Sequence, residues 1–189
     1  IIFSSMSFSV LIMTHNIMTI LFLPVIFIFF VLFFIKNKKR SIQFIFSLGV
    51  GMLLSAFFWI PALFEKNLIF LSQIPIADRN LYFVTIPQLI FPKFGYGPPT
   101  SSDGFGYQIG IAHILGFVVV VATLFFLYKK NKNNTAFISA VVISSTILCM
   151  VFFMFKESAI LWRLPMLSEI NYPWIILAPL VFLLSFLIG

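Results

Sequence analysis

The sequence predicts an all-α membrane protein, a polytopic bundle of transmembrane helices with interfacial or re-entrant helices in its outer loops. Hydrophobic residues make up 61% of the 189 residues and charged residues only 9%, whereas about a quarter of the residues of a soluble domain are charged. Phenylalanine occurs 27 times, and much of it lies in runs such as residues 27–34 that are apolar around the whole helix. Such helices face lipid or other helices.

Five apolar segments are expected to form helices at membrane depth, because a crossing helix needs roughly 20 apolar residues. They cover residues 17–35, 42–61, 109–128, 135–155 and 174–189, and the last is cut short. Residues 1–13 are too few to cross alone and are separated from the next segment by polar residues 14–16. We interpret residues 1–189 as a single transmembrane domain that is part of a larger protein.

Basic residues orient this bundle. Lys36, Lys38, Lys39 and Arg40 form one short loop, and Lys129, Lys130 and Lys132 lie in another, with no acidic residue in either. The remaining charges balance, so these seven cations equal the net charge of +7. The positive-inside rule then predicts that loops 36–40 and 129–134 are cytoplasmic in a multi-pass protein of the cell membrane. The charge therefore indicates topology and a lipid bilayer as partner, and no nucleic acid is expected.

Small residues predict where helices pack. Ser47, Gly51 and Ser55 are spaced four apart, as are residues 136, 140 and 144. Side chains of this size let helix backbones approach closely in lipid.

The two loops expected on the outer side, residues 62–108 and 156–172, hold most of the polar and turn-forming residues. The first contains two apolar stretches, residues 68–77 and 81–91, that are too short to span and so predict interfacial or re-entrant helices. It ends in a turn-rich run that includes Gly95, Tyr96 and Gly97. The second carries Trp162 and Trp174, and aromatic residues at span boundaries are commonly interface anchors.

Polar residues beside the apolar spans are the candidate ligand contacts. His15 and Asn16 interrupt an apolar stretch, where polar side chains are costly unless they face protein or water. They either contact a substrate at the outer mouth of the bundle or mark a helix break at which His15 caps a backbone group. His113 lies one turn into its span; it either faces the same cavity or forms a structural hydrogen bond.

The outer loops carry the candidate groups for chemistry. Glu65, Asp78 and Asp103 are carboxylates that can act as a general base or hold a metal beside a cavity, although each has a nearby cation with which it can pair. Arg163 is surrounded by aromatic and apolar residues and can recognise a phosphate with two parallel hydrogen bonds. Alternatively, it extends to the interface and pairs with Glu169.

Several function classes have no support in the sequence. The single cysteine, Cys149, lies in the middle of an apolar span and cannot form an internal disulfide or a metal cluster. No zinc-ligand spacing, phosphate-binding loop, nucleophile elbow or dinucleotide fingerprint is present. No metal ligands and no cofactor are identified from the residues.

The order of four motifs resembles a family of large bacterial membrane proteins. Residues 14–16 precede an apolar span and the run Phe58 to Glu65, and residues 91–97 are followed by residues 103–110. Residues 164–167 and 170–174 complete the set. This order resembles proteins labelled "6-pyruvoyl-tetrahydropterin synthase-related" and the YfhO-like proteins, which have a GT-C glycosyltransferase-like fold. One departure is Ile175, where those proteins tend to place arginine.

The resemblance implies a glycosyltransferase that uses a polyprenyl-phosphate-linked sugar at the outer face of the membrane. Under this interpretation Asp103, Glu65 and Asp78 are the catalytic candidates, and His15, Asn16, Tyr96, His113 and Arg163 are the substrate-binding candidates. The requirement for a divalent metal stays open. The alternatives are a transporter or flippase for a lipid or solute, which would have broken helices at the bilayer midplane and an internal repeat, and a non-catalytic membrane scaffold.

Overall fold

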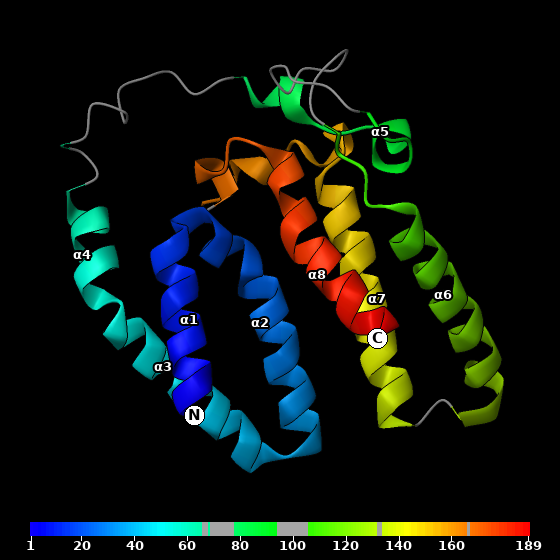
Figure 1. Ribbon diagram of the computed structural model, residues 1–189, viewed down its shortest axis with the longest axis horizontal. Helices are drawn as coiled ribbons and strands as arrows, with labels where there is room; N and C mark the ends of the chain where they lie inside the picture. The colour runs from blue at the N-terminus through cyan, green and yellow to red at the C-terminus, as the bar shows by residue number, and fades with distance from the viewer. Residues whose placement is uncertain (66–67, 69–77, 94–105, 132–133, 166) are drawn as a thin grey trace. The chain divides into compact units, whose positions relative to one another are not determined.

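The computed structural model describes residues 1–65, 68, 78–93, 106–131, 134–165 and 167–189, without the side chains of Asn16, Lys129, Lys130, Asn131 and Glu169. These residues form α-helices and short 3₁₀ helices, and no strand occurs among them (Figure 1). The chain divides into two compact units, Ile1–Pro75 and Ile76–Gly189. We describe each unit by itself.

The first unit contains four helices, α1 (Ile2–Thr14), α2 (Asn16–Lys36), α3 (Lys38–Leu54) and α4 (Ala56–Phe64). His15 separates α1 from α2 in an extended backbone conformation, and its side chain makes no capping hydrogen bond. Asn37 separates α2 from α3, and its side chain accepts hydrogen bonds from the backbone N–H groups of Lys39 and Arg40. A side-chain oxygen at this position satisfies donors that the first helical turn leaves free, so α3 begins directly after the break.

The expected span 42–61 coincides with two helices, α3 and α4, which meet at Ser55 with a bend of 67°. The buried Ser55 hydroxyl donates to the carbonyl oxygens of Gly51 at 3.0 Å and Met52 at 3.2 Å. The Trp59 indole N–H also donates to the Met52 oxygen at 2.9 Å. The Gly51 oxygen also keeps its helical bond from the Ser55 backbone N–H, at 3.2 Å. At the bend the side chains of Ser55 and Trp59 both donate to the Met52 oxygen, and side-chain donors of this kind are how a helix break is accommodated in an apolar setting.

Helix α1 packs closely on α3 through small residues. Ser5 and Ser9 of α1 and Ser47 and Gly51 of α3 are buried. A Cβ atom added to Gly51 would lie only 2.6 Å from the Ser5 carbonyl oxygen. The small-residue face predicted on α3 is therefore confirmed as a helix contact.

The second unit is built on three helices, α6 (Ile111–Asn131), α7 (Thr135–Phe153) and α8 (Leu177–Ile188), which lie side by side (Figure 1). Buried apolar side chains of α7 and α8, among them Ile147, Leu180 and Leu183, form its core. Helix α8 approaches α6 at Gly116, where an added Cβ would lie 2.6 Å from the Ile188 side chain. The lack of a side chain at Gly116 therefore permits this contact.

Three helical segments in the described part of the chain are long and apolar enough to cross a membrane: Ile17–Lys36, Ile111–Tyr128 and Thr135–Phe153. The bent pair α3 and α4 is a fourth if it counts as one span. The prediction that the chain is helical is confirmed for the described residues, and three of its helices have the length and composition that crossing a membrane requires.

Candidate functional site

Short helices cover one end of α7 in the second unit, and we call residues 78–93 and 154–176 the end cap. Its first segment holds η3 (Arg79–Tyr82) and α5 (Ile86–Ile90). Its second segment holds η4 (Lys156–Ser158), η5 (Leu161–Arg163), η6 (Leu167–Glu169) and η7 (Pro173–Ile176). The Val84 N–H donates to the Met154 carbonyl oxygen at 2.9 Å, so the two segments are joined through the backbone at the end of α7.

Trp162 is the centre of the end cap. Its side chain is fully buried, and its indole N–H donates to the carbonyl oxygen of Phe153 at 3.0 Å and to the Ser158 hydroxyl at 3.1 Å. The rings of Phe83 and Phe153 contact it edge-on. Buried tryptophan combines a large apolar surface with a donor that needs a partner, and both requirements are met here. Trp162 therefore packs inside the end cap of this unit.

Arg79 joins the two segments of the cap through its guanidinium group. Nε donates to the Ile170 carbonyl oxygen at 2.9 Å, Nη1 to that of Trp162 at 3.2 Å and Nη2 to that of Ser168 at 2.8 Å. The group also lies 5.6 Å from the centre of the Trp162 ring, a distance typical of a cation–π contact. Arg79 thereby fixes a segment more than eighty residues away in sequence.

An aromatic cluster joins the end cap to Tyr107. The rings of Tyr82 and Tyr172 meet edge-on, and Trp174 contacts both Tyr172 and Tyr107. The Tyr107 hydroxyl and the Trp174 indole N–H are buried without a hydrogen-bond partner. Burial, and to a smaller extent the proximity of Tyr82, raises the pKa of Tyr107 above its usual value. Tyr107 is therefore neutral at physiological pH.

A polar pocket of about 340 Å³ opens between the two segments of the cap. Asp78, Arg79 and Asn80 line it from the first segment and Arg163 from the second, together with Phe83, Ala159 and Ile160. The Asp78 carboxylate accepts hydrogen bonds from the backbone N–H and the side-chain amide of Asn80, at 3.0 and 2.8 Å. Two arginines and one carboxylate line the pocket, so its net charge is positive and favours a ligand that carries negative charge.

The structure brings together two of the residues predicted from sequence, Asp78 and Arg163, at this pocket. His113 lies elsewhere in the same unit, where its Nε2 atom is 3.1 Å from the Ser185 hydroxyl of α8. This contact fits the alternative in which His113 is a structural residue. His15 and Glu65 are exposed and belong to the first unit.

Three predicted contacts cannot be placed. Tyr96 and Asp103 lie outside the described residues, and the Asn16 side chain is not described. Among the residues that are described, no three His, Cys, Asp or Glu side chains are grouped so that they could hold a metal ion.

From the sequence, Arg79 is expected only as the cation near Asp78 with which that carboxylate can pair. In the structure, the Arg79 guanidinium instead donates hydrogen bonds to three backbone carbonyl groups. The Asp78 carboxylate accepts a hydrogen bond from the side-chain amide of Asn80. Every residue has a backbone carbonyl group, so the residue types in the sequence do not indicate which carbonyl groups Arg79 binds. An arginine between two apolar stretches was the only indication.

The fold and this pocket define a helical protein with helices long and apolar enough to cross a membrane and an end cap whose pocket is lined by two arginines. Comparison of the chain with models of protein families, with curated proteins and with solved structures finds no match.

Proposed function

We propose that the chain is part of a polytopic protein of the cell membrane, in which the end cap lies on the outer side and binds the phosphate of a polyprenyl-phosphate-linked sugar. The activity is that of a GT-C-like glycosyltransferase. The observation that carries the proposal is the polar pocket between Arg79 and Arg163, placed directly beside the end of a helix long enough to cross the membrane.

The charges of the pocket support an anionic ligand. Arg79 uses three of its N–H groups on carbonyl oxygens, so its position is fixed and its charge remains at the wall of the pocket. Arg163 is exposed and can present the planar fork that matches a phosphate group. We assign the phosphate to Arg163, with Arg79 as a fixed positive charge beside it.

Asp78 is the better placed of the two candidate carboxylates that the structure describes, because it lines the same pocket. In the proposed reaction the acceptor hydroxyl oxygen forms a bond to the anomeric carbon of the sugar. The bond from that carbon to the phosphate oxygen breaks, and its electron pair leaves with the phosphate. The hydroxyl proton passes to Asp78, which acts as the general base.

The resemblance in motif order supports the substrate class. The turn that carries Asp78 and Arg79, together with residues 164–174, belongs to the part of the chain in which those motifs occur. The two basic segments, residues 36–40 and 129–134, support a topology in which both are cytoplasmic. They were expected as loops, but Lys38, Lys39 and Arg40 lie in α3 and Lys129 and Lys130 in α6, so each lies at the ends of helices.

A transfer assay tests this function. The full chain in lipid vesicles is incubated with a polyprenyl-phosphate sugar, and release of the polyprenyl phosphate is measured. Arg163→Gln should reduce the rate by roughly 10- to 100-fold, because a hydrogen bond to a charged group contributes about 1.5–3 kcal/mol. Asp78→Asn should reduce it further without weakening donor binding.

Lys156→Gln is the matched control, since Lys156 is an exposed cation of the same cap that does not line the pocket. Its rate should equal that of the unmodified chain. Absence of transfer by the unmodified chain with every donor sugar and acceptor offered would reject the enzymatic function. Equal losses in the Arg163 and Lys156 variants would reject the pocket as the binding site.

A further inference from the structure

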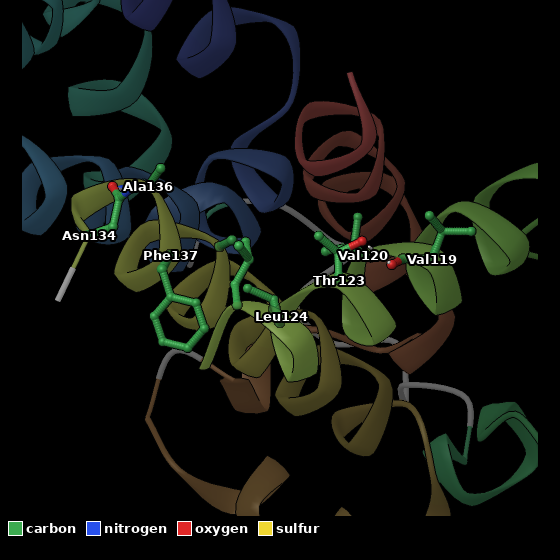
Figure 2. Close-up of a pocket in the computed structure, with 9 residues that line it drawn as sticks. Val119, Val120, Thr123, Leu124, Asn134, Ala136 and Phe137 are labelled. Carbon is green, nitrogen blue, oxygen red and sulfur yellow. Dashed lines mark hydrogen bonds between the residues drawn. The ribbon is translucent and has the colours of Figure 1, made fainter. Parts of the chain in front are cut away.

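Two pockets of the second unit differ in the chemistry of their walls. A pocket between α6 and α7 is lined by apolar side chains together with Thr123 and Asn134, and none of its described lining residues is ionisable (Figure 2). The pocket of the end cap is lined instead by a carboxylate and two arginines. A general base needs an ionisable group within reach of the substrate, so of these two pockets only that of the end cap is equipped for proton transfer.

The two oxygen atoms of the Asp78 carboxylate have different surroundings. Oδ1 accepts two hydrogen bonds from Asn80, one from its backbone N–H at 3.0 Å and one from its side-chain amide at 2.8 Å. Within the described part of the chain, no residue forms a hydrogen bond or an ion pair with Oδ2. Oδ2 is therefore the oxygen that is left to accept a proton from a ligand.

The two hydrogen bonds from Asn80 serve different purposes. Asp78 is the N-cap of η3, and the bond from the backbone N–H is the usual bond to such a residue. Any residue at position 80 except proline could donate it. The bond from the side-chain amide is additional, and the start of the helix does not require it.

The additional bond restricts the orientation of the carboxylate. The terminal torsion of an aspartate side chain is otherwise broad, and two donors on one oxygen limit rotation about it. Asp78, Asn80 and Arg163 line the same pocket. The direction of Oδ2 is thus held beside the arginine to which we assign the phosphate.

We propose that Asn80 is a positioning residue, which holds Asp78 so that its Oδ2 atom takes the proton of the acceptor hydroxyl. This inference rests on the proposed transferase function, in which Asp78 is the general base. The acceptor oxygen gives its proton to Oδ2 as it bonds to the anomeric carbon, and the polyprenyl phosphate leaves with the electron pair of the broken bond. Asn80 exchanges no atom with the substrate and acts through Asp78.

The variant Asn80→Leu tests the proposal, because leucine has a similar shape but no amide, and the backbone N–H bond stays in place. The full chain in lipid vesicles is assayed with the donor and acceptor for which the unmodified chain shows transfer. We expect kcat to fall on the order of tenfold. The KM for the donor should stay within about twofold, since loss of an interaction with the base affects the chemical step and not donor binding.

A double variant shows whether Asn80 acts through Asp78. In the Asp78→Asn background, Asn80→Leu should cause no further loss of kcat, because two residues that act as a unit have non-additive effects. A loss in this background as large as that in the unmodified chain would overturn the proposal.

Gln88→Met is the matched control. The Gln88 side-chain oxygen accepts hydrogen bonds from the backbone N–H and the hydroxyl of Thr85, at 2.9 and 3.0 Å, at the start of α5 in the same segment. Gln88 does not line the pocket, so its variant should keep the unmodified kcat. Equal losses in the Gln88 and Asn80 variants would reduce Asn80 to a structural role.

The same assay separates this inference from the function on which it rests. Transfer by the unmodified chain together with an unchanged kcat in Asn80→Leu would reject the positioning role alone. Absence of transfer by the unmodified chain would reject the transferase function and the positioning role together.

Discussion

Replacing Arg79 with methionine is expected to open the end cap. The variant keeps much of the apolar side chain but removes three hydrogen bonds from a charged donor to the carbonyl oxygens of Ile170, Trp162 and Ser168. Each such bond contributes about 1.5–3 kcal/mol. Because the bond to Ser168 is exposed, we expect a total loss of about 3 kcal/mol in the free energy of opening.

Hydrogen–deuterium exchange can measure this loss in the full chain. Amides of residues 156–176 that the cap protects should exchange on the order of 100-fold faster in the variant, since about 1.4 kcal/mol corresponds to a factor of ten. Arg163→Met is the matched control, because Arg163 is an exposed arginine of the same cap and its loss should change the free energy by less than about 0.5 kcal/mol. Unchanged protection in the Arg79 variant would show that Arg79 does not hold the segment in place.

A leucine at Gly51 is expected to separate α1 from α3. The first atom of the new side chain would lie 2.6 Å from the Ser5 carbonyl oxygen and 3.1 Å from the Phe8 ring. The closest of these atoms belongs to the backbone, so the helices must move apart. Overpacking of this kind costs about 1–3 kcal/mol, and faster exchange of the α1 amides would report it.

Gly49 provides the control in the same helix. Nothing lies within 4 Å of an added Cβ there, and the position is exposed. Leucine is the better helix former by somewhat less than about 1 kcal/mol, so Gly49→Leu should leave α1 protected. Equal behaviour of the two leucine variants would contradict the close contact between α1 and α3.

The helices were predictable because apolar runs of sufficient length must be helical at membrane depth, where every backbone group needs an internal partner. Breaks marked by polar residues were also recognisable, such as those at His15 and Asn37. The bend at Ser55 was not predicted, because the apolar pattern runs through it. Ser55 and Trp59 donate hydrogen bonds to backbone carbonyl groups at the bend, and bonds of this kind leave no pattern in the sequence.

The candidate site was only partly predictable for a related reason. Asp78 and Arg163 were recognisable as charged residues in apolar surroundings, but nothing in the sequence indicates that they share a pocket. The two residues lie at one pocket because Arg79 joins the two segments of the end cap, through hydrogen bonds to residues 83 to 91 positions further along the chain. Long-range bonds to backbone atoms leave no pattern of residue types, and so the sequence could not predict the organisation of the end cap.

We propose above that the chain crosses the membrane several times, with the basic segments 36–40 and 129–134 on one side and the end cap on the other. Labelling with a membrane-impermeant maleimide in intact cells tests it most directly, using single cysteines in a Cys149→Ser background. Glu157→Cys, in the exposed part of the cap, should be labelled from outside, whereas Lys36→Cys and Lys130→Cys should be labelled only after permeabilisation. Labelling of all three from the same side, or of the two basic segments from opposite sides, would contradict the account.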